Sequence, residues 1–234
     1  MEIALLGYGK MGKEIERIAV DLGHSIVFKG GSDWENEDLT GAEVVIEFSS
    51  PEAGFENVIR CLSLQIPIVS GTTGWHQSLP EAIAFCKEVD GSFFYASNYS
   101  LGVNIFFALN RVLAKWMDQF PQFCPHIVEL HHSMKKDIPS GTAISIAEDI
   151  LKNHSQFNSW TTENVKDQLK IESIREGEIP GTHSVRYQSL TDELHIEHIS
   201  HGRDAFAKGA LLAAEFLIGK KGFYQMNDLL NLNL

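Results

Sequence analysis

The sequence predicts an α/β fold: a Rossmann-like nucleotide domain with a parallel sheet, plus a second α+β domain whose sheet is mixed and largely antiparallel. Short apolar runs alternate with amphipathic stretches through roughly the first hundred residues. A GxGxxG segment follows the first apolar run directly. After Asn98 several strand-like runs succeed one another without helices between them. These three observations together predict two domains of different sheet type.

Composition narrows the class of protein. The chain has 234 residues, enough for one large domain or two small ones, and 44% of them are apolar, as in globular proteins. The formal charge of −12 argues against a nucleic-acid or anionic-membrane binder, because those need clustered Lys and Arg. No apolar run reaches the ~20 residues of a membrane helix, and the first residues lack the basic region of a signal peptide. We therefore expect a cytoplasmic protein with neither nucleic acid nor membrane as a partner.

The three cysteines, Cys61, Cys86 and Cys124, are odd in number, far apart and in no CxxC pair. That pattern argues against a disulfide framework or a structural zinc site. We expect buried, reduced thiols.

The first half of the chain reads as alternating strands and helices. Ile3–Leu6 is a continuous apolar run ended by glycine, typical of a strand buried on both faces. The stretch that follows, Met11–Leu22, has apolar residues at helical spacing. Further strands are expected at 25–28, 44–48, 66–69 and 92–96, and helices at 51–64 and 80–88. Such alternation predicts right-handed crossovers and a parallel sheet.

The second half has a different texture. We expect helices at 103–117, 140–151 and 205–218, and strands at 127–131, 170–175, 183–189 and 194–200. Val185 and Tyr187 alternate with Arg186 and Gln188, as in a half-exposed antiparallel sheet. The polar stretch 153–167 is the best candidate for a mobile loop. We expect the chain to leave the first domain near residue 101 and to return near Arg203, which makes 1–101 with 203–234 one domain and 102–202 the other.

The glycine-rich segment is the first candidate site. Its six residues, which we expect to contact a dinucleotide, are Gly7, Tyr8, Gly9, Lys10, Met11 and Gly12. Glycines there allow a tight turn and let the backbone approach a pyrophosphate at a helix N-terminus. The alternative is a glycine-rich turn without a ligand.

The end of the second strand bears on the choice of nucleotide. An acidic residue that would bind the ribose 2′-hydroxyl is expected there, but the sequence has Lys29 followed by two glycines. A cation suits a 2′-phosphate, which modestly favours NADPH over NADH. Asp33 reaches a 2′-hydroxyl only if the loop folds back, and Lys29 alone is also compatible with a solvated strand end.

Three further strand ends belong to the expected nicotinamide crevice, since ligands of such sheets lie beyond the carboxyl ends of the strands. Each taken alone is compatible with a plain turn. The residues are Phe48 and Ser49, then Gly71, Thr72 and Thr73, then Ala96, Ser97, Asn98 and Tyr99.

The densest polar cluster lies between Glu129 and Thr142. His131 and His132 can exchange protons near neutral pH, and Lys135 and Lys136 add positive charge to an acidic protein. Ser140 is placed to cap a helix, which would leave the N–H groups of Gly141 and Thr142 free to bind a carboxylate. The alternative is a solvated loop with incidental histidines, which the density of the cluster disfavours.

Three histidines raise a metal alternative: His195, His198 and His201. Strand alternation places His198 on the face opposite the other two, so ligation from one side is disfavoured. We predict no metal site.

With the polar cluster between Glu129 and Thr142 included, the chain resembles the 4-hydroxy-tetrahydrodipicolinate (dihydrodipicolinate) reductases of bacterial lysine and diaminopimelate synthesis. The family signature E-x-H-H-x-x-K-x-D-x-P-S-G-T-A matches Glu129–Ala143 throughout. Matches extend to the glycine loop, the Gly-Thr-Thr-Gly loop at 71–74, residues 96–104 and residues 222–230. The resemblance implies NAD(P)H-dependent reduction of 4-hydroxy-tetrahydrodipicolinate to tetrahydrodipicolinate with loss of water, without a metal.

The resemblance also implies roles for individual residues. His131 corresponds to the proton donor and acceptor, and Lys135 to the lysine that orients the substrate and donates a proton. The implied substrate-binding residues are His132, Ser140, Gly141, Thr142 and Arg203. The first domain would bind the nicotinamide cofactor, and the second would bind the cyclic dicarboxylate and build a homotetramer through its sheet.

Two departures from the family pattern leave the cofactor preference open. The glycine loop is one residue shorter than the common G-x-x-G-R-M-G form, with Lys10 at the arginine position, and the usual acidic residue after the second strand is missing. Two alternative functions remain: another nicotinamide oxidoreductase, such as a semialdehyde or homoserine dehydrogenase, and a non-catalytic dinucleotide sensor. The His-His-x-x-Lys run fits neither well.

Overall fold

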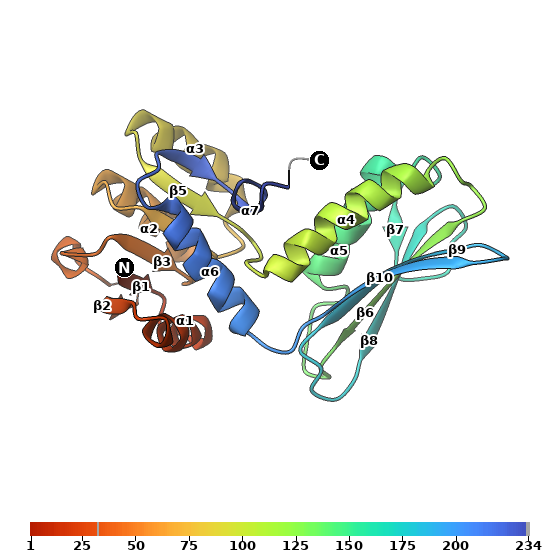
Figure 1. The fold of residues 1–234 in the computed structure, drawn as a ribbon, viewed down its shortest axis with the longest axis horizontal. Coiled ribbons are helices and arrows are strands. Elements are labelled where there is room, and N and C mark those ends of the chain that lie inside the picture. The colour runs from red at the N-terminus through yellow and green to blue at the C-terminus, as the bar shows by residue number, and fades with distance from the viewer. Residues whose placement is uncertain (32, 233–234) are drawn as a thin grey trace. The chain divides into compact units, whose positions relative to one another are not determined.

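The computed structural model describes residues 1–31 and 33–232, which fold into two compact units (Figure 1). Unit 1 contains Met1–Leu101 and the described residues from Arg203 onward, and unit 2 contains Gly102–Gly202. Each unit has its own sheet and its own core. The fold class predicted from the sequence is confirmed.

Unit 1 is built on a six-stranded sheet in the order β11-β5-β4-β3-β1-β2, in which every pairing is parallel. Its strands are β1 (Glu2–Leu6), β2 (Ser25–Gly30), β3 (Val44–Glu47), β4 (Ile68–Ser70), β5 (Ser92–Tyr95) and β11 (Gly222–Tyr224). Its helices are α1 (Lys10–Asp21), α2 (Pro51–Ser63), α3 (Leu79–Glu88), α6 (Asp204–Leu217) and α7 (Met226–Leu230), with 3-10 turns at η1 (Asn36–Leu39) and η2 (His76–Ser78). The strand order reverses between β1 and β3, which defines a switch point at the carboxyl edge.

Helices cover both faces of this sheet, which explains the continuous apolar strands. Leu5 packs on one face with residues of α1 and α6, and Leu6 packs on the other with residues of α2 and α3. Both leucines are at most 1% exposed. A strand covered on both sides has no polar face, so its sequence shows no alternation.

Unit 2 contains a five-stranded mixed sheet in the order β10-β9-β6-β8-β7. Its strands are β6 (Cys124–His131), β7 (Trp160–Thr161), β8 (Leu169–Arg175), β9 (Thr182–Gln188) and β10 (Glu193–Ile199). β9 pairs antiparallel with both β6 and β10 along its whole length, whereas the β6–β8 and β8–β7 pairs are parallel and shorter.

Two helices, α4 (Leu101–Met117) and α5 (Gly141–Asn153), supply the other half of the unit 2 core. Apolar side chains of α5 such as Ile146 and Ile150 pack with the inward residues of the strands, among them Val185 and Tyr187. Arg186 and Gln188 are exposed, as the alternation predicts.

The differences from the predicted elements lie in short segments. β7, β11 and α7 are absent from the sequence prediction because two to five residues carry too little periodicity. β7 lies inside 153–167, so the prediction of a loop there is wrong for Trp160–Thr161, and the Ser155 N–H is held by Asp118 at 2.6 Å. β6 begins at Cys124, which is exposed, so the prediction of a buried thiol is wrong there and holds for Cys61 and Cys86.

Across the described ranges, none of the helices is both long and apolar enough to cross a bilayer.

Candidate functional site

The glycine loop lies at the switch point of the unit 1 sheet. Gly7 has φ of +92°, and a Cβ there would overlap the carbonyl oxygen of Phe48, so only glycine fits between β1 and β3. A Cβ on Gly12 would overlap the carbonyl oxygen of Gly7. Gly9, the N-cap of α1, has no atom within 4 Å of its Cβ position and leaves the helix start open. This tight turn before open N–H groups fits a pyrophosphate.

Lys29 at the end of β2 is exposed and also paired. Its Nζ lies 2.6 Å from Oε1 of Glu16 and 5.0 Å from the centroid of the Tyr8 ring, and the Tyr8 hydroxyl donates to the other oxygen of Glu16. The pKa of Glu16 is lowered by the contacts from Lys29 and Tyr8, and the pKa of Lys29 is raised by Glu16. A 2′-phosphate would therefore compete with Glu16 for this lysine.

A buried carboxylate connects two strand ends of the expected crevice. Glu47, the last residue of β3, is 0% exposed. It accepts hydrogen bonds from the Ser49 N–H at 2.9 Å, the Ser70 hydroxyl at 2.6 Å and the Thr72 hydroxyl at 2.6 Å. The Ser49 N–H also approaches the Thr72 oxygen, at 2.8 Å. These bonds fix the loops after β3 and β4 relative to one another.

The remaining predicted cofactor residues also lie at this carboxyl edge or in the first turn of α1. Gly71 packs where a Cβ would overlap the Phe48 ring. Asn98 accepts from the Ser100 N–H at 2.9 Å. Tyr99 is 1% exposed and donates to the Ser70 carbonyl at 2.7 Å, so its side chain lies in the core. Exposed or half-buried positions are Lys10, Met11, Thr73 and Ser97, whereas Ala96 is buried.

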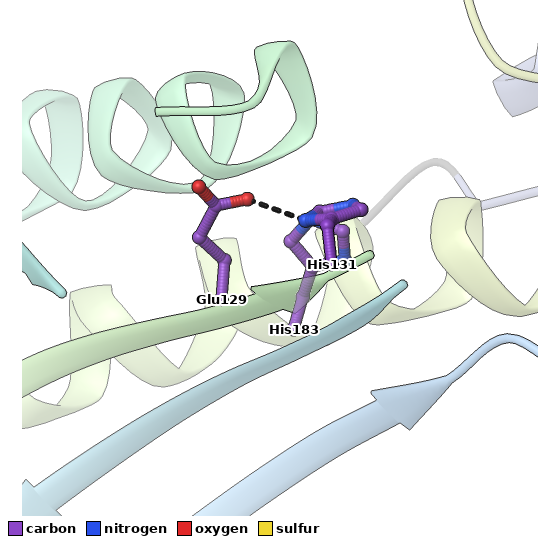
Figure 2. A group of neighbouring side chains, drawn as sticks. All are labelled: Glu129, His131 and His183. Atoms are coloured by element: carbon purple, nitrogen blue, oxygen red, sulfur yellow. Dashed lines mark ion pairs between the residues drawn. The ribbon is translucent and has the colours of Figure 1, made fainter. Parts of the chain in front are cut away.

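The second group of candidates lies in unit 2, around the end of β6. Figure 2 shows Glu129 and His131 on β6 and His183 on β9 turned toward one another. Nδ1 of His131 lies 2.8 Å from Oε2 of Glu129, an ion pair of which the carboxylate side chain is 0% exposed and the imidazole 9%. With Nδ1 facing Glu129, Nε2 is the nitrogen of His131 left for a ligand.

Two neighbours shape the space around the His131 ring. A Cβ on Gly181 would lie 2.9 Å from Nε2 of His131, and Gly181 has φ of +153°, so a side chain there is excluded on two grounds. His183 meets the His131 ring edge to face, with ring centroids 5.0 Å apart. Burial, helped by the charge of His131, lowers the pKa of His183 to about 3, so His183 is neutral.

Arg175 and Ser140 complete the surroundings of Glu129. Oε1 of Glu129 accepts from Nη2 of Arg175 at 2.8 Å and from the Ser140 N–H at 3.1 Å. Burial by itself raises the pKa of Glu129, but the contacts from His131, Ser140 and Arg175 outweigh it and hold the pKa well below its usual range. Glu129 is therefore a buried carboxylate that stays ionised.

The same serine caps the start of α5. The Ser140 oxygen accepts the Ala143 N–H at 3.2 Å and lies 3.1 Å from Nε2 of His183. Ser140 is thus the N-cap, as predicted. The N–H groups of Gly141 and Thr142 in the first turn have no acceptor within the helix and are open to a carboxylate.

The two adjacent lysines differ in their surroundings. Nζ of Lys135 lies 2.8 Å from both carboxylate oxygens of Asp137, and this ion pair lowers the pKa of Asp137. Lys136 is exposed, and His132 is half-buried. Lys135 is therefore positioned on the loop that joins β6 to α5, and a substrate carboxylate would compete with Asp137 for it.

Arg203 lies in unit 1, where it is exposed and forms the N-cap of α6. The other predicted substrate-binding residues, 132 and 140–142, lie in unit 2. The structure therefore groups Ser140, Gly141 and Thr142 around one helix start and places Arg203 in the other unit.

Glu129, His131 and His183 are also residues of metal-binding type, with ligand atoms within 4.8 Å of one another. The guanidinium of Arg175 already contacts the carboxylate at 2.8 Å, and its charge opposes a divalent cation there. We interpret the group as one that holds a proton. His195 and His201 are exposed, whereas His198 is half-buried and is paired with His183 across the β10–β9 ladder.

Comparison with known proteins identifies the family of this chain. The family model "Dihydrodipicolinate reductase, N-terminus" matches residues 21–99, and "Dihydrodipicolinate reductase, C-terminus" matches residues 102–230. The chain belongs to the dihydrodipicolinate reductase family.

Among its relatives is the 4-hydroxy-tetrahydrodipicolinate reductase of Christiangramia forsetii, 46% identical over 234 residues, which cover 99% of this chain and 98% of that protein. The enzyme of the same name from Trichlorobacter lovleyi is 34% identical over 213 residues, covering 86% of this chain and 78% of that protein. A solved structure, the dipicolinate-bound dihydrodipicolinate reductase of Paenisporosarcina sp. TG-14, has a TM-score of 0.77 at 20% identity, covering 96% of this chain and 97% of that one. The family resemblance predicted from the sequence is confirmed.

Three residues of this dihydrodipicolinate reductase site were not assigned a role from the sequence. Glu129 stands inside the signature but carries no signal of burial by itself. Arg175 ends a predicted strand and His183 begins another. The local sequence of these strands does not indicate that β8 and β9 pair with β6 on either side. Alternation of buried and exposed positions is the only sequence signal that points His183 inward.

Proposed function

We propose that this chain reduces 4-hydroxy-tetrahydrodipicolinate to tetrahydrodipicolinate with loss of water, with His131 as the proton donor and Lys135 as the residue that orients the substrate. That it is a nicotinamide-dependent reductase follows from its family and from relatives of that name over nearly the whole chain. The assignment of roles to individual residues is the part we propose.

One observation carries the assignment of roles: Ser140 contacts Glu129, the partner of His131, and also caps the helix start that would bind a substrate carboxylate. Its N–H donates to Glu129, which is paired with His131, and its side chain caps the helix whose first N–H groups would bind a substrate carboxylate. A carboxylate bound at Gly141 and Thr142 is thereby placed beside the imidazole. The dipicolinate of the solved relative is a cyclic dicarboxylate, which supports a substrate of that kind.

The chemistry requires little from the protein beyond positioning and one proton. A dinucleotide whose pyrophosphate is held by the glycine loop would supply a hydride from its nicotinamide ring. Loss of the 4-hydroxyl as water leaves a conjugated ring imine, and after reduction at C4 an enamine remains. His131 as imidazolium delivers a proton to the enamine carbon, while Lys135 holds a substrate carboxylate and stabilises developing negative charge.

For the cofactor, we infer a modest preference for NADPH. Lys29 supports it, since its ammonium stands at the strand end where the 2′ position is read. Glu16 opposes it, because a 2′-phosphate must displace this carboxylate. The contact between Lys29 and a 2′-phosphate is therefore favourable, but the loss of the Lys29–Glu16 ion pair partly offsets it.

We also infer a cytoplasmic homotetramer. The free thiols of Cys61 and Cys86 agree with a reducing compartment, and Ile199, on the face of β10 opposite the core, is 53% exposed, which suits a sheet face that contacts another copy. Size-exclusion chromatography with light scattering measures the assembly directly. A monomer at micromolar concentration would contradict it.

The activity is tested by the loss of NADPH or NADH absorbance after adding enzymatically generated substrate. We expect absorbance loss that depends on the substrate and is abolished in His131→Asn. A dinucleotide sensor would bind the cofactor and leave the absorbance unchanged. A semialdehyde or homoserine dehydrogenase would turn over those substrates instead.

A further inference from the structure

The surroundings of Glu129 contain a cation that the proposed reaction has not yet used. Arg175 is the last residue of β8 and is paired in the parallel ladder with His131 on β6. Its side chain is 12% exposed, and its Nη2 lies 2.8 Å from Oε1 of the fully buried Glu129. A charge held so far from water has a strong influence on its neighbours.

The two oxygens of Glu129 face two different side chains. Oε1 takes the guanidinium of Arg175, and Oε2 faces Nδ1 of His131 at 2.8 Å. The Ser140 N–H adds a third contact to Oε1. The imidazole therefore shares its counter-ion with a permanent positive charge.

Arg175 also anchors the loop that carries the lysine. Its Nη2 donates to the carbonyl of Asp137 at 2.7 Å, and the carboxylate of Asp137 holds Nζ of Lys135. One guanidinium thus contacts both the counter-ion of His131 and the partner of Lys135.

We propose that Arg175 is a positioning residue for proton transfer: it fixes Glu129 against His131 and, by sharing that carboxylate, weakens the attraction of Glu129 for the proton on His131. This rests on the proposed role of His131 as the proton donor. A carboxylate with no other partner would stabilise the imidazolium fully and make it a poorer acid. With Arg175 present, Glu129 still aligns the ring while its attraction for the proton is divided.

Other groups around His131 do not supply the same effect. His183 on β9 is neutral, and Lys135 on the loop is itself paired with Asp137. His132, next in the chain, is half-buried, and His198 on β10 lies beyond His183. Among the described residues, Glu129 is therefore the carboxylate at ion-pair distance from His131, and Arg175 is the cation at ion-pair distance from Glu129.

The test compares pH–rate profiles of kcat for the full-length enzyme and three variants. If imidazolium is the acid, activity falls as pH rises through its titration. R175Q removes a positive neighbour and moves that fall upward by about half a pH unit or more, and it lowers the kcat of the low-pH plateau because the imidazolium is then a weaker acid. E129Q removes the negative neighbour and moves the fall downward. R175K keeps the charge and keeps the fall close to that of the wild type.

The control is Arg186→Gln, which removes an exposed arginine from β9 of the same sheet and leaves the profile unchanged. Circular dichroism melts establish that each variant is folded. If R175Q is not, Arg175→Met fills the nearly buried space without a charge and replaces it in the series.

Unchanged profiles for folded R175Q or R175M, or shifts of R175Q and E129Q in the same direction, would overturn the proposal. So would R175K shifting as far as R175Q. If His131→Asn retains activity, the failure lies instead with the proposed proton donor, and the two failures are thereby distinguished.

Discussion

Two buried glutamates, one in each unit, show two ways of keeping a carboxylate away from water. Glu47 and Glu129 are both 0% exposed. Glu47 is surrounded by uncharged donors, the hydroxyls of Ser70 and Thr72 and the N–H of Ser49. Glu129 is surrounded by Arg175, His131 and one N–H. The first arrangement joins the loops after β3 and β4, whereas the second places a carboxylate beside a titratable histidine.

Burial alone therefore does not distinguish a carboxylate that takes part in proton transfer from one that holds loops in place. Hydrogen bonds from neutral donors satisfy a carboxylate and hold the loops that supply them, but no proton has to move. Opposite charges around a carboxylate couple its state to theirs, and a titratable partner such as His131 then has a controlled proton. Variants in unit 1 should therefore change binding, and variants in unit 2 should change turnover and pH dependence.

The largest effect is expected for Lys135→Met compared with Lys136→Met. Lys135 is fixed by Asp137 on the loop before α5, while Lys136 is exposed. A positioned ammonium that strengthens its contacts in the transition state lowers kcat when removed, by about 10²-fold or more. Lys136→Met changes KM modestly, and this change shrinks as salt rises.

Steady-state kinetics of the two lysine variants at low and high salt give the answer. Comparable losses of kcat would contradict the assignment of Lys135. A larger loss at Lys136 would place the catalytic lysine one residue further along.

The next prediction tests whether the two glutamates differ in function. Glu47→Gln turns one acceptor oxygen into a donor that faces hydroxyls, which costs about 1–3 kcal/mol of stability. We expect the Kd for the nicotinamide cofactor to rise about tenfold while the pH profile of kcat stays in place. Fluorescence titration with cofactor and a pH series measure both quantities. A shifted profile would show that Glu47, too, is coupled to a proton in the reaction.

Acid stability tests the neutral histidine in unit 2. Its folded pKa of about 3 lies below the unfolded value near 6.5, so the unfolded chain binds the extra proton. The stability that depends on neutral His183 is complete above about pH 6.5 and is lost as pH falls toward 3, by up to about 1.4 kcal/mol per pH unit. His183→Gln removes this dependence, so its urea-unfolding free energy falls less steeply between pH 6 and pH 4. Parallel curves for the two proteins would contradict a neutral His183.

The smallest effect concerns the nucleotide. Lys29→Glu weakens NADPH more than NADH, because a like charge then faces the 2′-phosphate. Glu16→Gln frees Lys29 from its partner and strengthens NADPH by a few-fold without changing NADH. Glu14→Gln, two residues earlier on α1 and paired with Arg17, is the matched control and leaves the ratio of NADPH to NADH affinity unchanged. Equal changes for both cofactors would show that Lys29 does not read the 2′ position.

Much of this molecule could be predicted from local sequence. The run 3–6 indicates a doubly covered strand, Gly7–Gly12 indicates the turn before α1, and Ser140 indicates a helix start, because each depends on a short stretch whose sterics or hydrogen bonds are local. β11 and β7 were missed, since strands of three and two residues form only because a neighbouring strand offers its edge.

The two sheet types, the parallel pairing in the sheet of unit 1 and the signature that contains His131 and Lys135 could all be predicted from the sequence alone. Three contacts follow only from the tertiary structure. Arg175 binds the carboxylate of Glu129, 46 residues earlier in the chain, and His183 lies against His131. Lys29 is paired with Glu16. Strand alternation and helix caps follow from the chain's own geometry. Which strand lies beside which depends on burying the whole apolar surface at once, so the charges brought together at strand ends are known only after the fold is complete.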